Sequence, residues 1–143
     1  MMMERLDVPS AAAALLADAA SLGPVRAILR SCSGFVELFC SADAFEVHGG
    51  WLHVRQPTAH LHVQVPALAA AAFHDAGDEA HPGRPSLWLL GRCGAPCLLL
   101  ILDQTEGEAR ARQETAFQAL RARWGTQVAF HGGDAPAEDR LLH

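Results

Sequence analysis

Histidine residues alternate with aliphatic residues in two short segments near the middle of the chain. Residues 51–55 read WLHVR and residues 60–65 read HLHVQV. Because successive side chains of a strand point to opposite faces, each segment, as a strand, separates its polar side chains from its aliphatic ones. Pairing of the two strands would then collect on one face Trp51, His53, Arg55, His60, His62 and Gln64, with His48 just upstream.

Three interpretations of this face are open. Haem would use all of its groups, since imidazole is the usual proximal ligand of haem iron, arginine pairs with carboxylates such as propionates, and tryptophan offers a flat apolar wall. A zinc ion needs three or four ligands at about 2.0–2.3 Å, and His60 and His62 lie roughly 7 Å apart along a strand. They would converge on zinc only with help from His53 or a loop. In the third interpretation, the histidines are ordinary polar residues of a solvent-exposed strand.

The composition excludes several classes of protein. The chain of 143 residues has a net charge of −5, and all eleven of its basic residues are arginine, which is a poor electrostatic footprint for nucleic acid. It has no run of about 18 apolar residues that would span a membrane. With 50% hydrophobic residues and one-domain length, we expect a single globular domain. Its motifs do not point to an enzyme, since GxSxG, HExxH and glycine-rich phosphate loops are absent.

The N-terminal segment predicts a cytoplasmic protein. Its apolar stretch resembles a signal peptide. However, Glu4 and Asp7 place negative charges where a signal peptide has a positively charged n-region, and Asp18 interrupts the apolar run. Without export, cysteines stay reduced and behave as small buried hydrophobes. We expect this of all four, which are Cys32, Cys40, Cys93 and Cys97.

The elements that must position the histidine-bearing segments are mainly strands. Runs of β-branched and other apolar residues between turn residues predict strands over 25–30, 34–39, 51–55, 60–65, 86–90, 97–103 and 127–130, and residues 45–47 lead into the Gly49-Gly50 turn. An amphipathic helix is predicted over about 10–22, the core extends over about 23–131, and a polar tail follows over about 132–143.

Two further helices complete the predicted architecture. The alanine-rich segment 67–73 predicts a short helix. Thr105 and Glu108 form a capping box that opens a long helix ending before Gly125. The order of elements indicates an α+β single domain in which an antiparallel β-sheet meander forms a platform flanked by helices.

Four segments, taken in order, resemble a known family. They are GPVRAILRSCSGFVELFC, HGGWLHVRQPTAHLHVQV, SLWLLGRCGAPCLLLIL and QETAFQALRARW. Over roughly residues 23–125 they are similar to the repeating half of the HemS/ChuX-like haem-utilisation proteins. The resemblance implies a cytoplasmic bacterial protein of iron acquisition with an antiparallel sheet platform. Because double-length members hold haem between two halves, it also implies that a half-length chain pairs as a homodimer.

The resemblance further implies a haem site on the strand of residues 60–63. It favours His62 as the ligand of haem iron, with His60 and His53 as alternatives, while Arg55 pairs with a propionate and Trp51 lines the face. A second histidine of the short members falls where this chain has residues 30–32, and the segment 10–22, which matches a ligand-bearing helix of double-length members, contains no histidine.

Three functions are consistent with this resemblance. The first is haem binding, for trafficking, storage or utilisation of haem iron. The second is an enzyme that degrades haem with an external reductant. The third is a divergent member that has lost haem and acts as a dimeric binding module.

Overall fold

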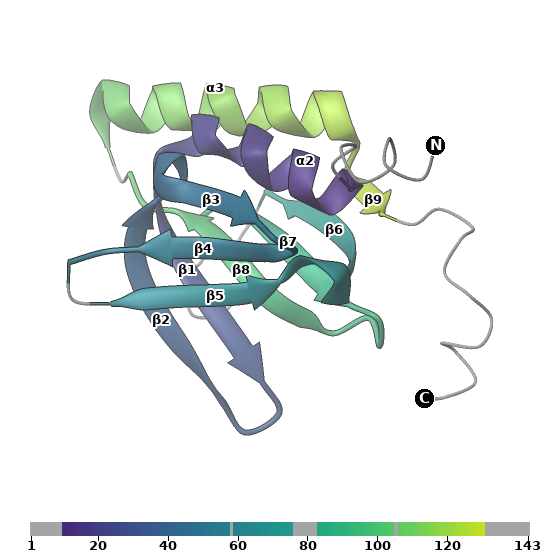
Figure 1. Ribbon diagram of the computed structural model, residues 1–143. Coiled ribbons are helices and arrows are strands. Elements are labelled where there is room, and N and C mark those ends of the chain that lie inside the picture. Colours follow the sequence, from purple (N-terminus) through teal and green to yellow (C-terminus); the bar gives the residue numbers. More distant parts are fainter. Residues whose placement is uncertain (1–9, 58, 76–82, 105, 131–143) are drawn as a thin grey trace.

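The computed structural model describes residues 10–57, 59–75, 83–104 and 106–130. Its described strands form two antiparallel sheets, and two α-helices pack against them (Figure 1). The predicted α+β class is therefore confirmed. The polar tail and His81, His131 and His143 lie outside the described residues.

The larger sheet contains six strands in the order β2-β1-β8-β7-β6-β9. Their bounds are β1 Pro24–Ser31, β2 Gly34–Ser41, β6 Leu68–His74, β7 Ser86–Gly91, β8 Pro96–Leu102 and β9 Gln127–Ala129. The two hairpins β1–β2 and β7–β8 form where the sequence predicts them. Strands β7 and β8 are central, as their continuous apolar sequences indicate, since both faces of such strands are covered.

The smaller sheet contains three strands in the order β3-β4-β5. They are β3 Phe45–His48, β4 Trp51–Arg55 and β5 His60–Gln64. Gly49 and Gly50 join β3 to β4, and their positive φ angles of 62° and 82° belong to a backbone region that favours glycine in a tight turn.

The first helix, α2 (Ala11–Asp18), begins where Ser10 accepts a hydrogen bond of 3.1 Å from the backbone N–H of Ala13. A 3-10 turn, η1 (Ala19–Leu22), continues it, and the chain leaves the turn at Gly23 with φ 69°. The long helix α3 spans Gly107–Trp124, with Glu106 at its N-cap position. Thr105 of the expected capping box lies outside the described residues.

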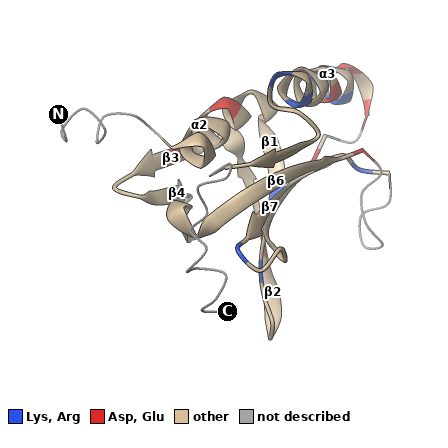
Figure 2. Ribbon diagram, turned by 90° about the vertical axis from the view of Figure 1, so that its right-hand side faces the viewer, with Lys and Arg blue, Asp and Glu red and all other residues tan. Residues whose placement is uncertain are grey.

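The core lies between the two sheets, with α2 and α3 side by side along one end of both (Figures 1 and 2). Each sheet and each helix contributes buried residues to this one cluster, among them Leu16, Leu52, Leu100 and Phe117. Figure 2 shows acidic and basic residues along α3, where Arg110 and Glu114 pair at 2.8 Å one turn apart.

The alanine-rich segment 67–73 is not the predicted helix: residues 68–74 form strand β6. Strand β6 pairs with β7 on one side and with β9 on the other. Its small side chains leave room for large neighbours, since Ala72 lies opposite Trp88. Helix propensity is a weak preference, and pairing along both edges of the strand overrides it here.

The cysteines also differ from expectation. All four are free thiols, but only Cys40 is buried, Cys97 is half-buried, and Cys32 and Cys93 are exposed in turns. Burial, with a smaller contribution from the charge of Asp103, raises the pKa of the Cys40 thiol to about 11. Within the described part of the chain, no helix has the length and apolar character needed to cross a membrane.

Candidate functional site

The register of β4 and β5 brings the sequence-predicted site residues together on one surface. The antiparallel pairs on this surface are Arg55 with His60, His53 with His62, and Trp51 with Gln64. Directly opposed residues of an antiparallel pair share a face of the sheet. We call this surface the histidine face and define it as Glu46, His48, Trp51, His53, Arg55, His60, His62 and Gln64.

The opposite face of the same strands explains why the histidine face points outward. Leu52 and Val54 of β4 are fully buried, and Leu61 and Val63 of β5 are nearly so. Burying these four aliphatic side chains stabilises the fold by about 1.5–3 kcal/mol each. A slip of one residue in register would expose them, so the hydrophobic pattern determines which side chains reach solvent.

Two of the imidazoles are in direct contact. Nδ1 of His53 lies 2.9 Å from Nδ1 of His62, which is hydrogen-bond distance, and the ring centroids are 5.0 Å apart. The ring of His60 is 6.0 Å from that of His62 on one side, and the ring of His48 is 6.5 Å from that of His53 on the other. The histidine face therefore carries a continuous row of imidazoles.

Strand β3 adds a carboxylate that the sequence motifs did not single out. Glu46 lies directly opposite His53, and His48 lies directly opposite Trp51. One transverse row of the face therefore reads Glu46, His53 and His62 across three strands. The turn glycines at 49 and 50, together with the alternation of residues 45–48, are the signal in the sequence that a third strand joins this hairpin.

The histidine face is open to solvent. His60, His62 and Arg55 are exposed, His53 is half-buried, and Trp51 keeps 39% of its surface accessible. A shallow groove adjoins the end of the face near Gln64, and its lining comprises Gln64, Pro66, Ala67 and Arg92. A flat ligand on this face would thus be covered on one side only by this chain.

A zinc site is not assembled among the described side chains, where no group of three or more His, Cys, Asp or Glu residues converges to hold a metal ion. The imidazoles follow one another along a row instead. The chemistry of the donors suits a ligand that brings its own metal and needs one axial nitrogen, because such a ligand does not require convergence.

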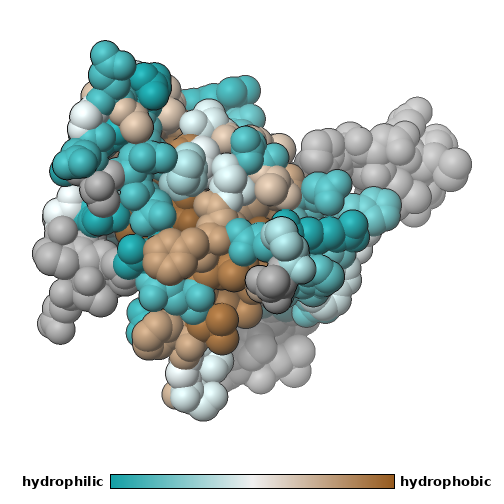
Figure 3. Space-filling model, turned by 90° about the vertical axis from the view of Figure 1, so that its left-hand side faces the viewer, coloured by the Kyte–Doolittle hydropathy of each residue, from teal (hydrophilic) through white to brown (hydrophobic). Residues whose placement is uncertain are grey.

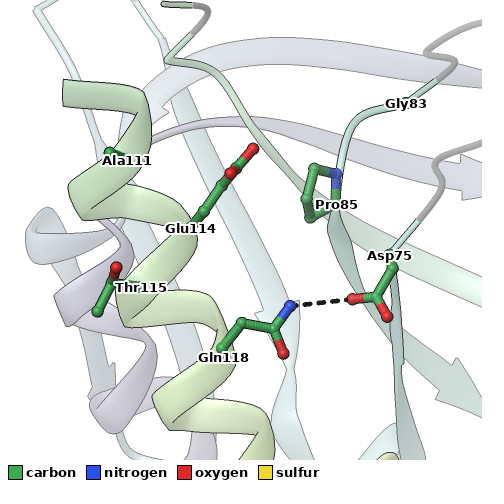
Figure 4. A pocket seen from close by; sticks show the side chains of 7 residues that line it. All are labelled: Asp75, Gly83, Pro85, Ala111, Glu114, Thr115 and Gln118. Carbon is green, nitrogen blue, oxygen red and sulfur yellow. Dashed lines mark hydrogen bonds between the residues drawn. The ribbon is translucent and has the colours of Figure 1, made fainter. Parts of the chain in front are cut away.

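A second groove lies between α3 and the ends of β6 and β7 (Figure 4). Asp75 borders it and accepts hydrogen bonds from Arg121 and from Gln118, the latter at 3.2 Å. These bonds hold the pKa of the Asp75 carboxyl below its usual range. Because the two carboxylates of its lining, Asp75 and Glu114, are already paired with Arg121 and Arg110, this groove offers no assembled ligand set among the described residues.

Comparison with known proteins places the fold. No family model matches the sequence, and no curated protein matches it. Among solved structures, the haem-binding protein ChuX superposes with a TM-score of 0.61 at 14% identity, covering 77% of this chain and 70% of that one. Holo-PhuS, a haem-binding protein from Pseudomonas aeruginosa, superposes with a TM-score of 0.60 at 22% identity. The match covers 78% of this chain and 31% of PhuS.

ChuS, a haem oxygenase from E. coli, gives a TM-score of 0.55 at 22% identity and covers 79% of this chain and 35% of ChuS. This chain thus matches most of the shorter protein and about a third of each longer one. At these identities the likeness is one of fold. The expected resemblance to HemS/ChuX-like proteins is confirmed at that level.

Proposed function

We propose that this protein binds haem on the histidine face, with a strand histidine as the axial ligand of the iron. The observation that carries the proposal is the row of imidazoles on β4 and β5, presented to solvent by a fold whose solved neighbours include haem-binding proteins. His62 is the favoured ligand because, of the two exposed histidines on the edge strand β5, it is the one whose ring is hydrogen-bonded to His53.

The ends of the histidine face differ in a way that would orient haem. Arg55 and His60 form a polar end, and a guanidinium pairs in a fork with carboxylates such as the propionates. Trp51, at the other end, provides an apolar wall for the hydrocarbon edge of the macrocycle. Bound haem would supply the iron chemistry, and these side chains would bind and orient it.

A second copy of the chain would cover the side of the haem that this chain leaves exposed. The edge strand β2 exposes Phe35 and Phe39 on one face, with 66% and 56% of their surface accessible, and Val36 on the other, with 62% accessible. Figure 3 shows hydrophobic surface on this side of the molecule. Exposed apolar edge strands are sites of association unless they are covered. Gln56, next to Arg55, donates a hydrogen bond to the backbone carbonyl of Phe39, so the patch adjoins the polar end of the histidine face. A homodimer formed through β2 would therefore extend beside the haem.

The proposed compartment is the cytoplasm, where haem would be carried after uptake. In that reducing compartment the exposed thiols of Cys32 and Cys93 would stay unpaired.

Titration of the purified protein with hemin, followed by the Soret band, tests haem binding. The wild type should saturate at one haem per chain or per dimer, and His62→Ala should shift the spectrum and weaken binding. His74→Ala is the matched control, since it removes an imidazole that stacks on Trp88 away from the face. If His62→Ala and His60→Ala both leave the spectrum and affinity unchanged, the proposed site is wrong.

A further inference from the structure

We propose that His53 is a positioning residue that holds His62 in one tautomer, with the proton on Nδ1. The unprotonated Nε2 of His62 is then the ring nitrogen of this pair that is available to a metal centre. The role of this nitrogen rests on the proposed function, whereas the tautomer itself is a property of the protein without haem.

The first step follows from the hydrogen bond between the two rings. A neutral imidazole carries one N–H and one lone pair, and a bond between two Nδ1 atoms 2.9 Å apart needs a donor and an acceptor. The ring that donates from Nδ1 has its lone pair on Nε2. The ring that accepts at Nδ1 carries its proton on Nε2. A neutral His53–His62 pair therefore presents one free Nε2 lone pair and no more.

The second step decides which ring is the donor. Glu46 lies directly opposite His53 on β3, whereas His62 is on the edge strand β5, two strands away from Glu46. An ionised carboxylate only accepts hydrogen bonds. Its negative charge therefore favours a proton on Nε2 of His53, the ring nitrogen that is not bonded to His62. His53 then accepts at Nδ1, and His62 donates.

The other charged and titratable neighbours do not oppose the assignment of His62 as donor and His53 as acceptor. Arg55 lies opposite His60, one row away from the His53–His62 pair. The ring centroids of His48 and His60 lie 6.5 Å from that of His53 and 6.0 Å from that of His62, farther than the 5.0 Å that separates the centroids of the hydrogen-bonded pair. In addition, His53 is half-buried on the central strand and His62 is exposed, so the accessible ring is the one assigned the free nitrogen.

The arrangement resembles the support that metal-binding histidines ordinarily receive. Such a histidine donates its second N–H to a neighbouring acceptor, which determines the tautomer and the ring orientation. Removal of that acceptor typically weakens metal binding about 10–100-fold. Here the acceptor is another imidazole, and the carboxylate residue Glu46 lies opposite it on the next strand.

The first test uses ¹⁵N-labelled protein without haem, at a pH where both rings are neutral. Long-range ¹H–¹⁵N correlation of the imidazoles should show His62 protonated on Nδ1 and His53 protonated on Nε2. In Glu46→Gln this preference should weaken, and in His53→Ala the Nδ1 proton of His62 should give way to a mixture of tautomers. His62 protonated on Nε2 in the wild type would overturn the inference.

The second test measures the effect on haem. His53→Ala should weaken hemin binding about tenfold or more and lower the iron–histidine stretching frequency of the ferrous complex. His53→Gln should restore much of both, because its amide oxygen can accept the same proton. His48→Ala is the control that removes a neighbouring ring and leaves the pair intact.

The two proposals fail separately. Hemin that does not bind the wild type, together with the stated tautomers, would refute the proposed function and leave the assignment of the pair standing. Hemin that binds through His62, with the same iron–histidine frequency in His53→Ala as in the wild type, would refute the positioning role alone.

Discussion

The side-chain amide of Gln113 on α3 donates a hydrogen bond of 2.6 Å to the backbone carbonyl of Leu22. The same nitrogen donates to the carbonyl of Pro24, and the amide oxygen accepts from the backbone N–H of Gln104 at 3.0 Å. Gln113 is 5% exposed, so one buried side chain connects the long helix to the junction between η1 and β1.

Replacement of Gln113 by Leu should destabilise the protein by about 2 kcal/mol or more, because buried backbone groups lose their partners. The measurement is the free energy of unfolding in urea. Thr115→Leu, at an exposed position of the same helix, should change it by no more than about 0.5 kcal/mol. Equal effects of the two substitutions would show that the buried amide does not matter.

The pKa of Cys40 leads to a prediction for alkaline conditions. Between about pH 9 and 11 the thiol of the unfolded chain ionises while the buried thiol stays protonated. The unfolded state then binds fewer protons than the native state, so stability falls as the pH rises, by up to about 2–3 kcal/mol. Burial also raises the pKa of Cys97, which adds to the slope.

Cys40→Ala should therefore flatten the decline in unfolding free energy above pH 9, and Cys93→Ala, in an exposed turn, should not. Urea unfolding at several pH values measures both. A decline that is as steep in Cys40→Ala as in the wild type would contradict the role of this thiol.

Arg55 should contribute to haem affinity through the propionates. Arg55→Ala should weaken hemin binding about tenfold, the size of one charge-assisted hydrogen bond, and Arg55→Lys should restore only part of it because lysine lacks the planar fork. The loss should shrink at high salt, where exposed charges are screened. Arg112→Ala, which removes an exposed arginine of α3, should leave the affinity unchanged.

The apolar patch on β2 predicts the oligomeric state. The wild type should sediment as a dimer at micromolar concentration, and Val36→Lys should sediment as a monomer because a charged residue on an edge strand opposes association. Ala122→Lys, at an exposed position of α3, should remain dimeric. A wild type that is monomeric at every concentration tested would refute the proposed β2 interface.

The local elements of this protein follow from its sequence because their causes are local. Alternation over residues 51–55 and 60–64 makes one face of each strand aliphatic, and the residues between them allow a hairpin. The side chains of the histidine face on β4 and β5 could therefore be grouped before any tertiary contact was known. The same holds for α3, whose buried residues Gln113, Phe117 and Leu120 recur at helical spacing.

Strand β6 shows where local reasoning fails. Four consecutive alanines favour a helix, yet the segment lies between β7 and β9, which are distant from one another in the sequence. The division into two sheets has the same origin, since β1 pairs with β8 across about 70 residues of chain. Which strands pair across such separations depends on packing of the whole core. No short segment of the sequence is therefore enough to predict the pairing.

The alternation along β4 and β5 is enough to assign which of their side chains face solvent, because the period of a strand and the burial of aliphatic residues act locally. No local pattern shows that the rings of His53 and His62 touch, that Glu46 lies opposite His53 on a third strand, or that β2 is an edge strand. Those relationships depend on the register and order of strands, which arise from contacts summed over the whole fold.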